Sequence, residues 1–332
     1  MRVFVAGATG AIGRRLVPLL IADGHSVTGM TRSPGKRAEL EKRGATAIVA
    51  DALDARAVAD AIERVRPEVL VHELTAIPAA LDIRKFEEQF RLTNRLRTEG
   101  TDNLLAAARA SGVRRFIAQS YAGWYARTGG AVKTESDPLD TNPPAALRDT
   151  VDAIKHLESA VLNAAGIDGI VLRYGGLYGP GNGLSEGGVL SEQVRQRKFP
   201  IVGGGTGVWS FIHVDDAARA TAAAVTHGAP GIYNIVDDDP APVSQWLSTL
   251  AEIVGAKPPM RLPAWLARFV VGPLGIVMMT DVRGASNRKA KAELNWQPAW
   301  PSWRQGFRHG LGDTPALTPA ASPRTSSQLT AS

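Results

Sequence analysis

The chain has 332 residues, of which 44% are hydrophobic, with no cysteine and a formal net charge of +6. The cysteine count excludes disulfides, a thiol nucleophile and a thiolate metal site. The charge suits an anionic cofactor, but no dense Lys/Arg block favours nucleic acid. No uninterrupted apolar run is long enough to span a bilayer, and the N-terminus lacks the charged-then-apolar pattern of a leader. We therefore expect a cytoplasmic protein without a membrane partner.

Short apolar runs alternate with helical patterns over about the first 236 residues. Strands are predicted at residues 3–6, 26–31, 47–50, 68–72, 115–119, 169–173 and 232–236. Helices are predicted at residues 11–22, 36–42, 55–65, 95–110 and 149–165. Asp54 is expected to cap the third helix, and Gly112 to end the fourth. Strands separated by such helices favour right-handed crossovers and a parallel sheet covered on both faces.

The pattern becomes irregular after residue 179. Glycine-rich segments at residues 179–188 and 203–207 surround a helical stretch from 190 to 198. Residues 262–279 are strongly apolar but are interrupted by Pro263, Arg268 and Pro273, which favours a buried or substrate-lining helix pair over membrane contact. Residues 313–332 carry almost no large apolar side chains and are predicted to form a disordered tail.

A glycine-rich turn follows the first predicted strand. Gly7, Gly10 and Gly13 stand at Gly-x-x-Gly-x-x-Gly spacing between that strand and a helix. This order lets backbone N–H groups approach a pyrophosphate at the helix N-terminus. Gly7 would allow the tight turn, Gly10 the close approach and Gly13 the packing of helix on strand. The sequence therefore predicts a dinucleotide site in which Thr9, Ala11 and Ile12 also take part.

The tip of the second strand indicates which dinucleotide is bound. An acidic residue there binds the ribose of NAD, whereas arginine accommodates the extra phosphate of NADP. Here Thr31 and Arg32 are followed by Ser33, Lys36 and Arg37, with no carboxylate from residue 24 to 38. NADP is favoured over NAD, although a solvated basic turn would look the same. Further cofactor contacts are predicted from Asp51 (a partner of the adenine or a strand-end cap), Ala52, Leu53, Leu74, Thr75, Ala76, Lys155, Tyr174 and Gly175.

Further segments resemble one family of enzymes. They are Asn94, GTDNLL at 100–105, GVRRFI at 112–117, LRYG at 172–175, YGPG at 178–181, FIHVDDAA at 211–218, YNI at 233–235 and AKAELNWQP at 290–298. Together with the glycine turn, they resemble the extended short-chain dehydrogenase/reductases, the NAD-dependent epimerase/dehydratase group. The resemblance covers about residues 1 to 310.

This resemblance implies an α/β fold: a Rossmann doubly wound parallel sheet with a smaller C-terminal substrate domain. The expected nucleotide domain comprises residues 1–178 plus about 210–237. The expected substrate domain comprises residues 179–209 plus 238–312. The resemblance also implies a small-molecule substrate, which could be anionic or sugar-like, and a homodimer formed through the fourth and fifth helices. Within the pocket, Gly175 and its neighbours should pass beside the nicotinamide amide.

The family's catalytic motif is incomplete. Its members use Ser or Thr, then Tyr-x-x-x-Lys on one helical face, where the lysine lowers the phenol pKa and binds the ribose. The matching helix here keeps Lys155, but Val151 stands at the tyrosine position and can transfer no proton. Ser120 or Tyr121, at the end of the fifth strand, could supply the missing group. Tyr121 could equally be a core residue, and Tyr125 is a weaker candidate.

Several polar residues have structural alternatives to a functional role. His72 or Glu73 could face the nicotinamide, although a lone histidine is more often structural. His213 begins a metal-like cluster without ligand spacing, so no metal is predicted, and Asp215 or Asp216 is expected to cap a helix. Four basic residues could meet an anionic substrate or lie on a solvated surface: Arg195, Arg197, Lys198 and Arg288.

Two functional hypotheses follow. The first is an NAD(P)-dependent oxidoreductase or epimerase-like enzyme that moves a hydride between nicotinamide and a carbonyl or carbinol carbon. The second is a non-catalytic NADP-binding sensor of the same fold, which the loss of the tyrosine at Val151 motivates. Substrate choice is expected to depend on residues 181–207 and 240–285, whose loop shapes composition does not define.

Overall fold

A computed structural model describes residues 1–312. Its centre is a seven-stranded parallel sheet with the order β12-β7-β5-β4-β1-β2-β3. The strands are β1 (Arg2–Ala6), β2 (Ser26–Thr31), β3 (Thr46–Val49), β4 (Val69–His72), β5 (Arg115–Tyr121), β7 (Asp168–Tyr174) and β12 (Gly231–Ile235). All seven predicted strands are confirmed, and no end differs by more than two residues. The predicted tail, residues 313–332, lies outside the described residues.

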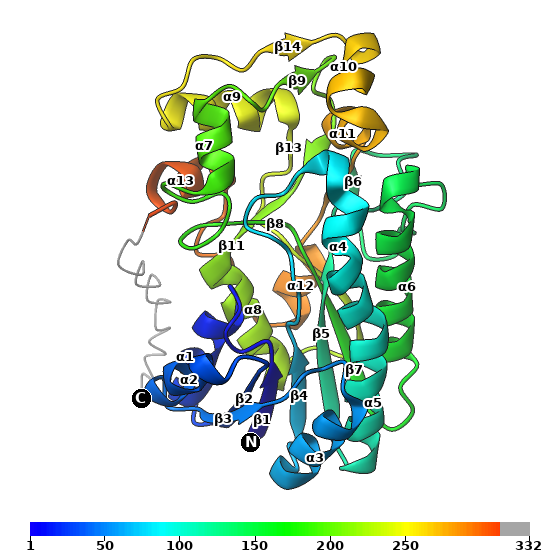
Figure 1. Cartoon of the computed structure of the whole chain (residues 1–332), viewed down its shortest axis with the longest axis vertical. Helices are drawn as coiled ribbons and strands as arrows, with labels where there is room; N and C mark the ends of the chain where they lie inside the picture. Colours follow the sequence, from blue (N-terminus) through cyan, green and yellow to red (C-terminus); the bar gives the residue numbers. More distant parts are fainter. Residues whose placement is uncertain (313–332) are drawn as a thin grey trace, which may run out of the picture.

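Helices cover both faces of this sheet, so the doubly wound Rossmann fold is confirmed (Figure 1). They are α1 (Gly13–Ala22), α2 (Arg37–Lys42), α3 (Ala55–Val65), α4 (Phe86–Arg95), α5 (Thr101–Ala110), α6 (Arg148–Leu162) and α8 (Val214–Thr226). One apolar cluster lies under α1 and α8, and a second lies under α3, α5 and α6. Because the strands are buried on both faces of the sheet, their sequences are nearly continuous apolar runs.

The fourth predicted helix is longer than the sequence indicated. It begins at Phe86, passes through a π-helical turn (Leu96–Gly100) and continues as α5. The prediction missed α4 because this helix is rich in charge and buries only a narrow face, including Phe86 and Phe90 at four-residue spacing. The two rings stack with centroids 4.0 Å apart.

Two predicted helix termini are confirmed. Asp54 accepts hydrogen bonds from the backbone N–H groups of Arg56 and Ala57, both at 3.0 Å. Gly112 follows α5 with φ +73°, a conformation that glycine adopts without steric cost. At α8 the predicted cap is wrong, because His213 accepts the N–H of Asp215 at the helix start, at 3.2 Å.

Later segments gather beyond the carboxyl ends of the sheet strands (Figure 1). They are β8 (Gly176–Tyr178), α7 (Val189–Arg195), β9 (Ile201–Val202), β10 (Val208–Trp209), β11 (Phe211–His213), β13 (Ala241–Pro242), α9 (Val243–Ile253), β14 (Arg261–Leu262), α10 (Ala264–Val270), α11 (Gly272–Thr280) and α13 (Trp303–His309). Most share an aromatic-rich cluster that includes Tyr178, Phe211 and Trp303. Two further elements, β6 (Val132–Lys133) and β15 (Gly284–Ala285), pair in parallel, and α12 (Arg288–Glu293) follows. The residue limits of the two domains remain a prediction.

The apolar segment 262–279 forms the expected helix pair, but its two helices differ in burial. Helix α11 buries Leu274 and Met279, whereas α10 exposes Trp265 (70%) and Phe269 (64%). The buried alternative is therefore wrong for α10, and the substrate-lining alternative stays a prediction. Within residues 1–312, no helix combines the length and apolar character needed to cross a membrane.

Candidate functional site

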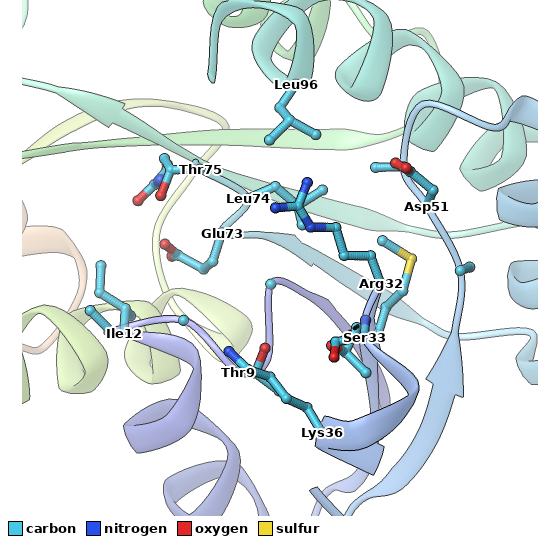
Figure 2. Close-up of a pocket in the computed structure, with 18 of the residues that line it drawn as sticks. Thr9, Ile12, Arg32, Ser33, Lys36, Asp51, Glu73, Leu74, Thr75 and Leu96 are labelled. Carbon is cyan, nitrogen blue, oxygen red and sulfur yellow. Dashed lines mark hydrogen bonds between the residues drawn. The ribbon is translucent and has the colours of Figure 1, made fainter. Parts of the chain in front are cut away.

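A pocket of about 260 Å³ opens at the carboxyl ends of β1, β2, β3 and β4 (Figure 2). Its lining includes these residues that the sequence predicts for the cofactor: Gly7, Thr9, Gly10, Ala11, Ile12, Thr31, Arg32, Asp51, Ala52, Leu74 and Thr75. It also includes Ser33 and Lys36, which the sequence offers as donors to the extra phosphate of NADP, and Glu73, which the sequence offers as a residue facing the nicotinamide. Leu177, which the sequence places beside Gly175 near the nicotinamide, also lines the pocket, and the lining is completed by residues that were not predicted: Met30, Ala50, Leu92, Leu96 and Gln119. Apolar residues at strand ends and on α4 carry no local signal for such a role.

The glycine turn forms a cradle that side chains would fill. A Cβ on Gly7, which has φ +92°, would lie 2.6 Å from the carbonyl oxygen of Glu73. Gly13 does not line the pocket, but a Cβ there would lie 2.7 Å from the Cα of Ala8. No side chain caps the N-terminus of α1, and its first turn holds no acidic residue. The geometry therefore suits an anionic group at the helix start.

The end of β2 is basic and accessible. Figure 2 shows Arg32 extending into the pocket, with Ser33 and Lys36 nearby. Asp51 lines the same end of the pocket, and its Oδ1 accepts the N–H of Leu53 at 3.0 Å. Asp51 can therefore accept the Leu53 N–H at the strand end and also contact a ligand in the pocket.

Glu73 lies at the other end of the pocket, beyond Leu74 (Figure 2). Its Oε1 accepts a hydrogen bond from the Tyr174 hydroxyl at 2.8 Å, and Tyr174 also contacts the Thr221 hydroxyl at 2.6 Å. Burial raises the pKa of Glu73 to about 8. His72 points to the opposite face of β4, where its Nε2 lies 3.1 Å from the Thr101 hydroxyl, and burial lowers its pKa to about 4. The geometry thus gives His72 its structural role.

Ser120 belongs to a buried ion-pair network rather than to the pocket lining. Its hydroxyl donates to Glu158 Oε1 at 2.7 Å. Arg173 donates to both oxygens of Glu158, from Nε at 2.7 Å and from Nη2 at 2.6 Å. The predicted proton-donor role of Ser120 is not supported by this geometry, because its hydroxyl proton is committed to a carboxylate.

Two tyrosines near the end of β5, Tyr121 as its last residue and Tyr125 beyond it, also lie outside this pocket's lining. Tyr121 packs against Trp124, with ring centroids 5.3 Å apart, and burial raises its pKa to about 12. The Tyr125 hydroxyl donates to Asn234 Oδ1 at 2.6 Å. Tyr121 is partly buried against an apolar cluster and lines a second, smaller cavity together with Trp124 and Trp209.

The structure does not bring Lys155 into the pocket lining. Its side chain is 41% exposed and lies 3.8 Å from Asp152 on the same helix. The face of α6 that meets α4 instead carries Thr150, whose hydroxyl accepts from the amide of Asn94 at 3.1 Å. Val151, at the expected tyrosine position, is fully buried in an apolar cluster. Val151 and Lys155 share one face of α6, but Val151 is covered by its apolar cluster whereas the Lys155 side chain is partly exposed.

The remaining predicted residues make structural contacts. The N–H of Ala76 donates to the Thr93 hydroxyl at 3.0 Å, and the N–H of Gly175 donates to the carbonyl of Ile235 at 3.1 Å. Among the basic residues predicted for an anionic substrate, Arg195 is paired with Glu192, and Arg197 donates to the carbonyl of Pro258. Neither lines the pocket.

Sequence reasoning also missed a buried cation. Arg97, on the π-helical turn, is 5% exposed, and its Nε and Nη1 have no partner among the described residues. Burial lowers its pKa to about 10, and the neighbouring Glu158 opposes that shift. A π-helical turn is a frequent feature of functional sites, but this turn carries no sequence signal of its own.

The model of one protein family matches residues 3–236, which is more than half of the chain. Its description is the NAD-dependent epimerase/dehydratase family. The chain belongs to this family. Its members use a nicotinamide dinucleotide, and this epimerase/dehydratase family protein is therefore an NAD(P)-dependent oxidoreductase or epimerase-like enzyme.

Known relatives differ in what they act on. The family protein is 46% identical over 308 residues to a 3-diazoavenalumate denitrifying reductase from a Streptomyces species, across 92% of this chain and 99% of that one. It is also similar to the UDP-glucose 4-epimerase of Thermus thermophilus solved with NAD (TM-score 0.71, 25% identity, 93% of this chain and 97% of that one). A human epimerase family protein with NADPH shares the fold (TM-score 0.69, 20% identity, 93% of this chain and 96% of that one).

Proposed function

We propose that this family protein is an NADP(H)-dependent reductase whose acceptor is a diazo-substituted small molecule. The cofactor choice is supported by the end of β2, where Arg32, Ser33 and Lys36 line the pocket without a neighbouring carboxylate on that segment. These groups can hold an extra ribose phosphate through charge-assisted hydrogen bonds. The uncapped start of α1 and the cradle at Gly7 fit the pyrophosphate. When bound, the nicotinamide supplies a hydride to the acceptor.

Replacing Arg32 tests the cofactor choice. We expect Arg32→Ala to weaken NADPH binding by about 10- to 100-fold, since a charge-assisted hydrogen bond contributes about 1.5–3 kcal/mol. NADH binding should change by less than about twofold, because NADH carries no phosphate at that position. Titration calorimetry measures both. Arg37→Ala is the matched control, because Arg37 pairs with Glu41 on the exposed side of α2 and does not line the pocket. An equal loss for both cofactors in Arg32→Ala would contradict the assignment.

The acceptor class is supported by the similarity to the denitrifying reductase and by the residues on α6. A carbonyl acceptor gains negative charge on oxygen and needs an acid beside it. Here Val151 is apolar, and the Thr150 hydroxyl is a far weaker acid than a phenol. A diazonium group instead leaves as neutral N2 with the electron pair of its carbon–nitrogen bond. Its departure requires no proton, so this acceptor does not need the missing tyrosine.

The experiment supplies the purified protein with NADPH and 4-carboxybenzenediazonium carrying nitrogen-15. We expect one labelled N2 and one benzoate for each NADPH consumed, measured by mass spectrometry and chromatography. Control reactions without protein and with heat-denatured protein measure the rate at which NADPH reduces the diazonium ion without catalysis. If no rate above these controls appears while ketones are reduced, the protein is a carbonyl reductase, as two relatives at 27% identity are named. If NADPH binds and neither class turns over, the proposed reductase is refuted and the non-catalytic sensor becomes the favoured alternative.

The same proposal includes the predicted homodimer through the fourth and fifth helices. In the structure these correspond to α4–α5 and α6, which pack side by side (Figure 1). Sedimentation of the purified chain measures the oligomeric state directly. A species of twice the chain mass of 35.2 kDa is expected, and a single species of 35.2 kDa would refute the dimer.

A further inference from the structure

Glu73 is a carboxyl group without a positive partner, in the pocket that binds the cofactor. Its side chain is largely buried (the residue is 6% exposed), yet it lines the pocket. Tyr174 donates to Oε1, whereas Oε2 has no hydrogen-bond partner among the described residues. A buried carboxylate without compensation is costly, so the group holds a proton near neutral pH.

Among the described residues, no cation forms an ion pair with Glu73, and the two cations that line the same pocket, Arg32 and Lys36, come from the end of β2. Tyr174 on β7 is the titratable group that touches it, and burial raises the pKa of Tyr174 well above its usual value, so it stays neutral. Helix α8 contributes the Thr221 hydroxyl. The charged groups at the start of α8 are engaged elsewhere, because Asp215 pairs with Arg15 and Asp216 binds Arg219 and the backbone N–H groups of Ala299 and Trp300. Gly7, Ile12, Gln119 and Leu177 also line the pocket and carry no charge.

The position of Glu73 assigns it to one half of the cofactor. Arg32 and Asp51 lie at the end of the pocket proposed for the adenosine and its phosphate, and Glu73 lies at the other end (Figure 2). A dinucleotide bound across the glycine turn therefore directs its nicotinamide toward Glu73. That ring is cationic when oxidised and neutral when reduced, and a nearby positive charge favours a carboxylate over a carboxylic acid.

We propose that Glu73 is a positioning residue that matches its protonation to the redox state of the bound nicotinamide: its carboxyl is neutral beside the reduced cofactor and ionised beside the oxidised one. The proton leaves Oε2 for solvent when the oxidised form binds. This inference rests on the proposed cofactor and is independent of the proposed acceptor. It gives the site a preference between the two redox forms that changes with pH.

Titration calorimetry tests this proposal through proton release. NADP⁺ and NADPH are each titrated at pH 7 in two buffers with different ionisation enthalpies, which gives the number of protons released. The difference between the two cofactors removes the contribution of their shared phosphates. We expect wild-type protein to release up to one more proton with NADP⁺ than with NADPH. Below pH 8, the ratio of NADP⁺ affinity to NADPH affinity should increase by up to tenfold for each unit by which the pH is raised.

The variants separate Glu73 from other groups. Glu73→Gln mimics the neutral acid and should abolish both the proton difference and the pH dependence of the ratio. Tyr174→Phe removes the hydrogen bond to Oε1 and should move the dependence to higher pH, because that bond favours the ionised form. Glu63→Gln, at an exposed position on α3, is the matched control and should behave as wild type.

Two results would overturn the inference: equal proton release with both cofactors in wild-type protein, or an undiminished difference in Glu73→Gln. Failure of wild-type protein to bind either cofactor would instead refute the proposed function.

A second measurement, the pH dependence of unfolding, does not depend on ligands. Between the ordinary pKa of 4.5 and about 8, the unfolded chain ionises Glu73 while the folded protein keeps its proton, so this group lowers stability as pH rises. Glu73→Gln should remove that component from urea-unfolding curves.

Discussion

Gly13→Ala is expected to weaken the binding of either nicotinamide dinucleotide by more than about 100-fold, a loss of about 3 kcal/mol or more. The new Cβ would overlap the carbonyl oxygen of Gly7 and lie 2.7 Å from the Cα of Ala8. These contacts are with backbone, which has no flexible side chain to move aside. Helix α1 must therefore shift away from β1, and the pyrophosphate cradle opens. Calorimetric titration measures the binding, and thermal unfolding measures the accompanying loss of stability.

Gly35→Ala is the matched control for that change. Gly35 lies at the tip beyond β2, and the nearest atom to a Cβ there is the Ser33 hydroxyl oxygen at 3.9 Å, an ordinary contact. Its binding affinity should stay within about twofold of wild type, because no packed atom has to move. If Gly13→Ala bound the cofactor as tightly as Gly35→Ala, the close packing of α1 on the glycine turn would not be required for binding.

Glu158→Ala is expected to lower the free energy of unfolding by about 3–5 kcal/mol. Glu158 and Arg173 form a two-fold hydrogen-bonded ion pair in which the side chains are only 7% and 4% exposed. Removing the carboxylate leaves the Arg173 guanidinium buried without its partner, and the Ser120 hydroxyl also loses its acceptor. Arg97, whose pKa Glu158 helps to sustain, loses a stabilising charge as well. Urea unfolding at neutral pH measures the change.

An exposed ion pair provides the comparison. Glu99 pairs with Arg95 at 2.8 Å, but both side chains are 51% exposed. Glu99→Ala should therefore lower the free energy of unfolding far less than Glu158→Ala does, since water solvates the remaining charge. A cost for Glu158→Ala no larger than that for Glu99→Ala would show that the buried network does not depend on its carboxylate. Glu158→Gln keeps a hydrogen-bond acceptor but removes the charge, so its loss in free energy of unfolding should lie between those of Glu158→Ala and Glu99→Ala.

The strands, the glycine turn and the cofactor end of the pocket were predictable because their signals are local. A buried parallel strand needs a short apolar run, and the turn at Gly7 needs a residue that tolerates φ +92°. Arg32 and Asp51 follow strands whose carboxyl ends meet at one edge of the sheet, so their arrival in one pocket follows from topology.

The substrate end of the site was predicted less well. Successive residues of a strand point to opposite faces, and this alternation places Gln119 at the pocket while Ser120 turns to Glu158. The sequence contains the ends of β5 and α6 but does not state which face of each element meets the cofactor. The resemblance to the family's motif therefore names residues on these elements without showing which of them meet the pocket.

The amino-acid sequence by itself determined the order of strands and helices, the family and the nucleotide-binding turn, since these depend on periodicity and on backbone conformations that few residues adopt. Only the tertiary structure decided which polar groups meet in the pocket. Lys155 on α6 is left partly exposed, and the alignment of the ends of β4 and β7 on either side of β5, together with α8, brings Glu73 and Tyr174 together across 101 positions of sequence. Such contacts depend on the relative placement of elements, which no local pattern encodes.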